Sequence, residues 1–261
     1  MLDQPDGNSM AYYAFIGRWS RLAAREFLSW LSIAPHRCWL DVGCGTGALT
    51  AEILASESPK RVYGIDPSVE RIEYAQGALP SAQFWVGDAQ QLPNDWANFD
   101  VVVSGLAFNL FADPLRALTE MIRVSRPGGT LAVYCWDFAE GMQLLRYLWD
   151  AATEGDPAAA KIDPANRYPL AQPNRLQRLF EEAELHGIEM QPLECSTGFS
   201  DFEDFWSPFL KGTSHTQRYV SGLAEEMRLE LRDRLKQRLP IQPDGKIHLS
   251  ARAWAIRGTC Q

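Results

Sequence analysis

The chain has 261 residues, 46% of them hydrophobic, and a formal net charge of −8. This length fits one large domain or two small ones, and the apolar share is ordinary for a protein with a substantial core. The acidic balance argues against a broad basic face, so we expect no nucleic-acid partner.

The ends and the cysteines predict a cytoplasmic protein without a membrane partner. Residues 1–7 are polar and do not resemble a secretory signal, and no apolar run approaches membrane-spanning length. The five cysteines are scattered without metal-ligand spacing, so we expect reduced thiols and no metal site.

A helical segment is expected before the first strand. Apolar residues recur at helical spacing from Ala11 to Ile33, which predicts one long or two short helices. Pro35 ends this pattern, and residues 37–42 read as the first strand.

A glycine-rich turn follows that strand directly. Gly43, Gly45 and Gly47 lead into a predicted helix over 48–56 and a second strand over 61–66. This order makes a βαβ unit, whose glycines allow positive φ and close approach of a ligand to the helix N-terminus. Asp66 would then stand at the tip of the second strand, within reach of ribose hydroxyls.

The spacing of the turn leaves two nucleosides to consider. A dinucleotide fingerprint has the form Gly-x-Gly-x-x-Gly, and here Ala48 stands where the last glycine would be. Alanine is tolerated there, so a nicotinamide dinucleotide stays open. Asp41 argues against it, because an anion before the turn would face a pyrophosphate, whereas it suits a ligand with an ammonium group.

The next elements continue the alternation of helices and strands. The dipeptide Asp66-Pro67 predicts a helix start with Asp66 at the cap, and residues 82–86 read as the third strand. The apolar run over 99–104 indicates a central strand buried on both faces. Asp113-Pro114 is expected to cap the following helix, and a turn at 126–129 leads into a strand over 130–136. The buried face of the helix after Asp66 is expected to include Val69, Ile72, Ala75 and Leu79.

Beyond residue 136 the pattern is less regular. We expect a helix over 141–152, a loop over 154–173 above the active face, a helix over 176–185 and a strand over 188–195. Residues 201–245 interrupt the sheet with an aromatic patch, a polar loop containing His215 and a charged helix. Residues 248–257 alternate as an antiparallel strand at or near the sheet edge.

Four segments carry a resemblance to a known class of proteins. The run Leu40-Asp41-Val42-Gly43-Cys44-Gly45-Thr46-Gly47 resembles motif I of the class I S-adenosylmethionine (SAM)-dependent methyltransferases. Gly87-Asp88-Ala89 and Arg126-Pro127-Gly128-Gly129 are similar to later segments of that family. Residues 134–137 and those after them resemble bacterial small-molecule methyltransferases related to quinone-pathway enzymes.

This resemblance implies an α/β fold: a Rossmann-like, seven-stranded, mostly parallel sheet with helices on both faces and an antiparallel last strand. It implies one domain over 1–261, with a core of about 35–136, 172–199 and 246–258. A helical cap would come from about 10–33, 137–171 and 200–245.

The resemblance also implies SAM as cofactor. The glycine turn would hold its methionine part, Asp66 its ribose and Asp88 its adenine amino group. The loop after the fourth strand would lie beside the transferred methyl group, and it lacks the Pro-Pro motif of enzymes that methylate base nitrogens. The expected cofactor-binding residues are Asp41, Gly43, Cys44, Gly45, Gly47, Asp66, Pro67, Asp88, Ala89, Gly105 and Leu106.

The expected reaction is in-line displacement of the methyl group onto a small, partly apolar acceptor. Such a reaction depends mainly on alignment and exclusion of water, so it needs no catalytic triad or metal. Asp137 and His215 are the candidate bases for an acceptor proton. Two alternatives are a SAM-binding regulatory or scaffold protein without transfer, and an NAD-dependent dehydrogenase. The candidate acceptor-lining residues are Tyr13, Trp19, Phe108, Asn109, Trp136 and Trp206.

Overall fold

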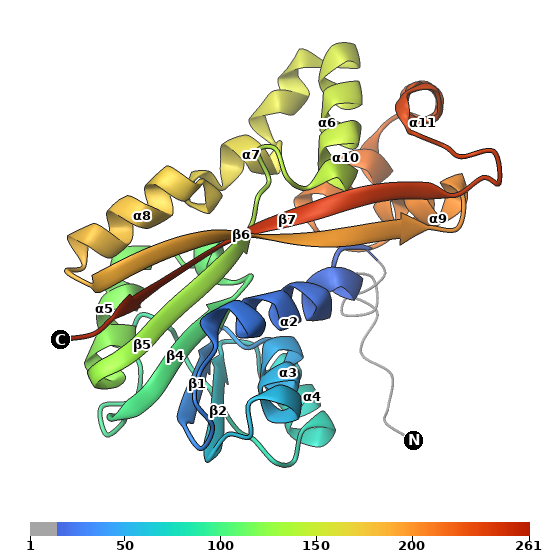
Figure 1. Ribbon diagram of the computed structural model, residues 1–261. Coiled ribbons are helices and arrows are strands. Elements are labelled where there is room, and N and C mark those ends of the chain that lie inside the picture. Colours follow the sequence, from blue (N-terminus) through green and yellow to red (C-terminus); the bar gives the residue numbers. More distant parts are fainter. Residues whose placement is uncertain (1–14) are drawn as a thin grey trace.

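A computed structural model describes residues 15–261 and shows one seven-stranded sheet in the order β3-β2-β1-β4-β5-β7-β6 (Figure 1). Strands β1 to β5 are parallel, and β7 runs antiparallel to both of its neighbours. The predicted fold class is therefore confirmed, with β7 one strand inside the edge. The strands are β1 Cys38–Val42, β2 Arg61–Asp66, β3 Gln83–Val86, β4 Phe99–Gly105, β5 Ser125–Trp136, β6 His186–Phe199 and β7 Ile247–Thr259.

Ten α-helices lie within the described residues, most of them packed on the sheet. They are α2 Ser20–Leu31, α3 Ala48–Ser56, α4 Val69–Ala78, α5 Pro114–Val124, α6 Gln143–Gly155, α7 Pro164–Arg167, α8 Pro173–Glu182, α9 Phe202–Trp206, α10 His215–Gly222 and α11 Glu225–Arg238. Short 3₁₀ segments are η1 Gly17–Trp19, η2 Phe108–Leu110, η3 Pro157–Lys161, η4 Pro169–Ala171 and η5 Ser207–Leu210.

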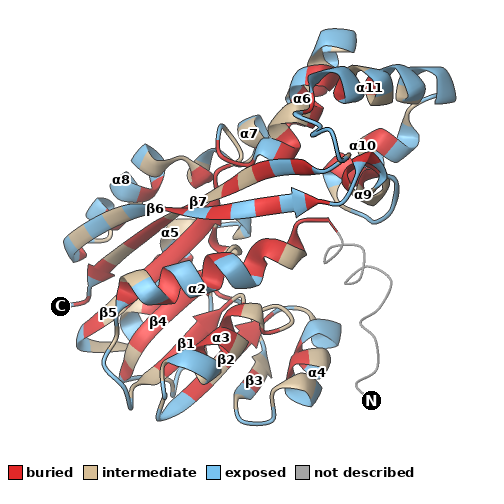
Figure 2. Ribbon diagram, turned by 45° about the vertical axis from the view of Figure 1, so that its right-hand side comes forward, coloured by how far each residue is buried: buried red, intermediate tan, exposed pale blue. Residues whose placement is uncertain are grey.

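Alternate residues of the central strands enter two separate cores. Val101 and Val103 of β4 pack with α2 and α3, whereas Val102 packs with α5 and α8 on the other face. Successive strand residues point to opposite faces, so the continuous apolar run of β4 is explained by helices on both sides. Figure 2 shows the resulting buried band along β1, β4 and β5.

An outer lobe rises beyond the carboxyl tip of β5. The β5–β7 pairing ends at Trp136 opposite Ala253, while β6 and β7 continue together to Phe199 opposite Ile247. These free ends of β6 and β7, together with α6, α7, α9, α10 and α11, form what we call the outer lobe (Figure 1). It joins the sheet at the edge where the parallel strands end.

Several local expectations were wrong. Segment 154–173 is not a loop but the short helices η3, α7 and η4, of which the first two begin with proline after a capping aspartate. Ser68, not Asp66, caps α4, and Val69 is 55% exposed rather than buried. His215 begins α10 instead of lying in a loop. No helix of the described part is long and apolar enough to span a membrane.

Candidate active site

The glycine turn between β1 and α3 has the backbone that the sequence predicts. Gly43, Gly45 and Gly47 have φ values of 74°, 55° and 86°. A Cβ on Gly43 would lie 2.7 Å from the Cβ of Ala107, in the loop after β4, so a side chain is excluded there by contact as well as by φ. The Gly43 N–H donates to the carbonyl of Ile65 at 2.8 Å, which ties the turn to β2.

Asp66 lies against this turn at the end of β2. Its side chain is buried, and Oδ2 accepts the Gly45 N–H at 3.0 Å. Oδ1 accepts the Ser68 N–H, also at 3.0 Å. The carboxylate therefore holds the glycine turn and the start of α4 in fixed positions, and each oxygen retains a further lone pair for a ligand.

Asp41 is buried on the other side of the turn, with 1% of its surface exposed. Its Oδ2 accepts the Thr50 hydroxyl at 2.8 Å, while its Oδ1 has no hydrogen-bond partner in the described part of the chain. Burial raises the pKa of Asp41 to about 7; the Thr50 hydrogen bond opposes this shift and the charge of Asp66 adds to it. An open buried carboxyl oxygen of this kind suits a cationic donor.

The third predicted acid, Asp88, follows β3 and is exposed. Its carboxylate accepts the backbone N–H of Gln90 at 2.9 Å and the Gln90 side-chain amide at 3.2 Å. Because β1, β2 and β3 are adjacent and parallel, all three acids lie toward the same edge of the sheet. Cys44 lies close to the first two: burial, Asp41 and Asp66 all raise the pKa of its thiol. Next to the acids, Pro67 is exposed and Ala89 is buried.

The loop after β4 is held against β5. The Leu106 N–H donates to the carbonyl of Tyr134 at 2.8 Å, and Leu106 has a positive φ of 61°. A Cβ on Gly105 would meet the Tyr134 hydroxyl at 2.8 Å. Phe108 is fully buried with α5 and α8, whereas Asn109 is half-buried. Of the two predicted acceptor-lining residues here, only Asn109 keeps exposed surface.

The predicted acceptor-lining tryptophans belong to one buried cluster. Trp19 meets Phe199 edge to face at 5.5 Å between ring centroids, and Trp206 stacks on Phe202 at 6.4 Å. Trp136, at the tip of β5, is 2% exposed, and its indole N–H has no partner within residues 15–261. All three belong to the buried core on the α2 face of the sheet, which continues into the outer lobe. Tyr13 lies outside the described residues.

Both carboxylate oxygens of Asp137 accept hydrogen bonds from other residues of the chain. Its Oδ2 accepts Arg252 Nε at 2.8 Å, Arg252 Nη2 at 2.6 Å and the Trp254 indole at 3.2 Å. Its Oδ1 accepts two backbone N–H groups of the following turn at 3.1 Å. Both carboxylate oxygens are therefore already engaged by protein donors, so the geometry disfavours the predicted role as a base.

His215 is exposed at the start of α10, where α10 packs on η5 in the outer lobe. Partial burial and the charges of Arg167 and Arg218 lower its pKa. The described contacts of α10 do not connect it with the glycine turn, so the structure brings His215 together with neither Asp41 nor Asp66.

Sequence reasoning did not single out Thr50, Gln90, Arg252 or Arg18. Thr50 could have been found, because it lies three residues after Gly47, within the first turn of the helix that follows. Arg252 lies 115 residues from Asp137, and no local pattern connects the two.

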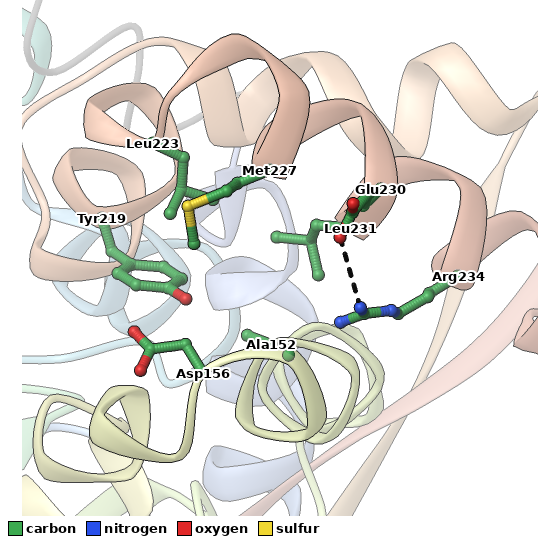
Figure 3. Close-up of a pocket in the computed structure, with 9 residues that line it drawn as sticks. Ala152, Asp156, Tyr219, Leu223, Met227, Glu230, Leu231 and Arg234 are labelled. Atoms are coloured by element: carbon green, nitrogen blue, oxygen red, sulfur yellow. Dashed lines mark hydrogen bonds and ion pairs between the residues drawn. The ribbon is translucent and has the colours of Figure 1, made fainter.

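Two cavities lie away from this edge. One of about 30 Å³ opens between α6, α10 and α11, with Tyr219 and Asp156 on one side and the Glu230–Arg234 ion pair on the other (Figure 3). It has room for about two water molecules. The other, about 150 Å³, is lined by residues such as Ala34, Asp100 and Arg126 at the amino ends of the strands. Ligands of parallel sheets bind at the opposite, carboxyl edge, so neither cavity is the candidate site.

Comparison with known proteins agrees with this location. A family described as methyltransferase domain matches residues 40–133, from β1 into β5. The trans-aconitate 2-methyltransferase of Methylobacterium radiotolerans is 32% identical over 180 residues, which cover 64% of this chain and 68% of that protein. The demethylmenaquinone methyltransferase of Deinococcus radiodurans is 37% identical over 119 residues, 44% of this chain and 48% of that protein.

An uncharacterized methyltransferase of Mycobacterium tuberculosis is 31% identical over 153 residues, 58% of this chain and 62% of that protein. The chain therefore spans less than two thirds of the length of this relative. Among solved structures, the YcgJ protein of Bacillus subtilis has a TM-score of 0.59 at 16% identity, over 92% of this chain and 98% of that one. A putative methyltransferase of Anabaena variabilis has a TM-score of 0.60 at 19% identity, over 89% and 95%. These two show the fold.

The chain belongs to the class I SAM-dependent methyltransferases, whose methyl donor is SAM. Because the chain belongs to this family, the alternative of an NAD-dependent dehydrogenase, which the glycine spacing left open, no longer applies.

Proposed function

We propose that the protein transfers the methyl group of SAM to a small, partly apolar acceptor at the carboxyl edge of β1, β2 and β4. The observation that carries this proposal is the arrangement of two buried acids around the glycine turn. Asp66 is fixed by two backbone N–H groups, and Asp41 keeps one buried oxygen without a partner among the described residues.

Each acid has a chemical counterpart in the cofactor. Asp41 would accept the ammonium of the methionine part, Asp66 the ribose hydroxyls and Asp88 the adenine amino group. Around them we place the other cofactor-binding residues: Gly43, Cys44, Gly45, Gly47, Pro67, Ala89, Gly105 and Leu106. The sulfonium supplies a good leaving group, so the chain has to orient the acceptor and exclude water, which can contribute on the order of 7–11 kcal/mol.

The acceptor side is apolar and aromatic. Trp19, Trp136 and Trp206 all belong to the buried core that runs from the α2 face of the sheet into the outer lobe. The relatives named for trans-aconitate and demethylmenaquinone act on small molecules, which supports a small-molecule acceptor here. The net charge of −8 disfavours a nucleic-acid acceptor.

The test is calorimetry with SAM and S-adenosylhomocysteine, followed by measurement of S-adenosylhomocysteine release with a panel of small acids and phenols. Micromolar binding is expected, and Asp41→Asn or Asp66→Asn should weaken it at least tenfold. Asp95→Asn, which changes an exposed acid in the loop before β4, is the matched control and should bind as the unmodified protein does. Absence of SAM binding at millimolar ligand would refute the proposal.

One observation favours a second function. Asp137 is tied to Arg252 and Trp254, and this leaves no assigned base among residues 15–261. A protein that binds SAM without transferring its methyl group would show tight cofactor binding and no S-adenosylhomocysteine release with any acceptor of the panel.

A further inference from the structure

Arg18, in η1 just before α2, has an unusual environment. Its guanidinium carbon lies 4.7 Å from the Trp19 ring centroid and 4.6 Å from that of Phe199. Its Nη1 donates to Asp204 at 3.0 Å. Its Nε and Nη2 are buried and have no partner in the part of the chain that the structure describes.

The two open nitrogens make up one edge of the guanidinium. Nε–H and one Nη2–H point in parallel from that edge, which is the geometry that binds both oxygens of a carboxylate. The Trp19 and Phe199 rings contact the guanidinium, and Asp204 accepts a hydrogen bond from Nη1. The edge formed by Nε and Nη2 is therefore the part of the guanidinium that has no hydrogen-bond partner among the described residues. Buried donors are almost always hydrogen-bonded in folded proteins, and charged donors most of all. An unfilled fork at this position therefore points to a missing anionic group.

The position of Arg18 follows from how α2 lies along the sheet. Arg21 and Arg25 of α2 both pair with Glu52 of α3, at 2.9 and 2.8 Å, and α3 begins directly after the glycine turn. The other end of α2 lies toward the amino ends of the strands, where Ser32 and Ile33 share a cavity with Asp100. The amino end of α2, with Arg18 before it, is thus at the carboxyl edge, beside α9 (Figure 1).

The rings beside Arg18 belong to the buried core on the α2 face of the sheet, which also includes the tip of β5. Trp19 and Phe199 belong to it together with Trp136 and Leu49. Leu49 is the second residue of α3, next to the glycine turn, and Trp136 ends β5 beside the loop where the methyl group would lie. An acceptor bound between these side chains would have its apolar body among aromatic rings and one end at the Arg18 fork.

We propose that Arg18 binds a carboxylate of the methyl acceptor through Nε and Nη2, so that the acceptor is a small carboxylic acid with an apolar body. This inference rests on the proposed function and adds the chemical class of the acceptor. Arg18 is a specificity-determining residue: it holds the acceptor by its anionic end, and the flanking rings keep the fork desolvated and fixed in direction.

The experiment uses the full chain saturated with S-adenosylhomocysteine. Calorimetry measures binding of phenylacetate and trans-aconitate, with phenylacetamide as an uncharged analogue of similar shape. At least one carboxylate should bind ten times more tightly than the amide. Arg18→Gln should lower that affinity at least tenfold, while the affinity for S-adenosylhomocysteine changes less than twofold.

Two further variants separate the fork from the fold. Asp204→Asn breaks the ion pair on Nη1 but leaves the fork, so it should keep carboxylate affinity within about twofold. Arg18→Lys keeps a cation between the rings and loses the bidentate edge, so it should lose most of the affinity while remaining folded. If Arg18→Gln does not fold, the carboxylate affinity of Arg18→Lys tests the role of the fork by itself.

Carboxylates that bind no better than the amide, or an Arg18→Lys variant with unchanged carboxylate affinity, would overturn the inference. Failure of the proposed function has a different signature, because then S-adenosylhomocysteine itself would not bind to the unmodified protein.

Discussion

The glycine turn and the outer lobe meet at one edge of the sheet, and they are built in different ways. In the turn, β1, α3 and β2 follow one another within residues 38–66, and the key contacts join neighbours such as Asp66 and Ser68. Where the outer lobe meets the segment before α2, Phe15 packs on Phe209 at 5.2 Å and Trp19 on Phe199 at 5.5 Å. These contacts join segments more than 170 residues apart in the chain.

The polar groups of the two regions also differ in their hydrogen-bond partners. Asp66, beside the turn, has both carboxylate oxygens bonded to backbone N–H groups. At the junction with the outer lobe, the Trp136 and Trp149 indoles and the Arg18 fork are buried without partners within residues 15–261. On the proposed cofactor side, backbone groups hold Asp66 and one acceptor oxygen of Asp41 stays open, whereas on the proposed acceptor side the open groups are donors.

The sharpest way to break the turn is Gly43→Ala. A left-handed φ costs about 1–2 kcal/mol for an L-residue, and the 2.7 Å approach to Ala107 adds overpacking of about 1–3 kcal/mol. We expect the free energy of unfolding to fall by about 3 kcal/mol and SAM binding to be lost. Urea unfolding and calorimetry measure the two effects.

Gly45→Ala is the matched control, since a Cβ there meets no atom within 4 Å. Its unfolding free energy should fall by only about 1 kcal/mol. Equal losses in the two variants would show that contact with the β4 loop does not constrain the turn.

Asp137→Asn tests whether the start of the outer lobe is catalytic or structural. Asparagine cannot satisfy Arg252 and the backbone turn together, so we expect a loss of about 2 kcal/mol in unfolding free energy. The turnover number per folded molecule should stay within about threefold. Urea unfolding and S-adenosylhomocysteine release measure these quantities.

Glu140→Gln is the control here. Glu140 is 83% exposed and lies 3.4 Å from the same arginine, so its loss should cost less than about 0.5 kcal/mol. If Asp137→Asn lowered the turnover number about a hundredfold at unchanged stability, Asp137 would be the catalytic base.

The smallest expected effect is the pH dependence of SAM binding. With the pKa of Asp41 at about 7, the carboxyl is largely protonated at pH 5.5 and half ionised at pH 7. The ammonium of SAM stays charged over this range, so affinity should rise about tenfold from pH 5.5 to 7. Calorimetry at several pH values measures it, and Asp41→Asn should remove the rise.

Stability should change in the opposite direction. The folded-state pKa of Asp41 lies above its ordinary value of 3.8, so between these values the native state keeps a proton that the unfolded state releases. Stability from this group therefore falls as pH rises from about 4 to 7. An affinity for SAM that stays constant from pH 5.5 to 7 would mean that Asp41 does not face the ammonium.

The sequence by itself determined the parts that depend on local chemistry. Helix α3 begins and ends at Ala48 and Ser56 as predicted, because glycine precedes it and Pro59 follows it closely. Asp113 caps α5 as predicted. The alternation of strands and helices predicted the sheet, since parallel neighbours need helical crossovers.

Only the tertiary structure decided which partner each polar group takes. Asp66 was expected to cap α4, but parallel pairing of β1 and β2 brings the Gly45 N–H to it, and Ser68 becomes the cap. The β5–β7 pairing likewise places Arg252 against Asp137, the predicted base. Neither partner lies next to the acid along the chain, so packing of distant segments, which local propensity does not specify, assigned these groups their roles.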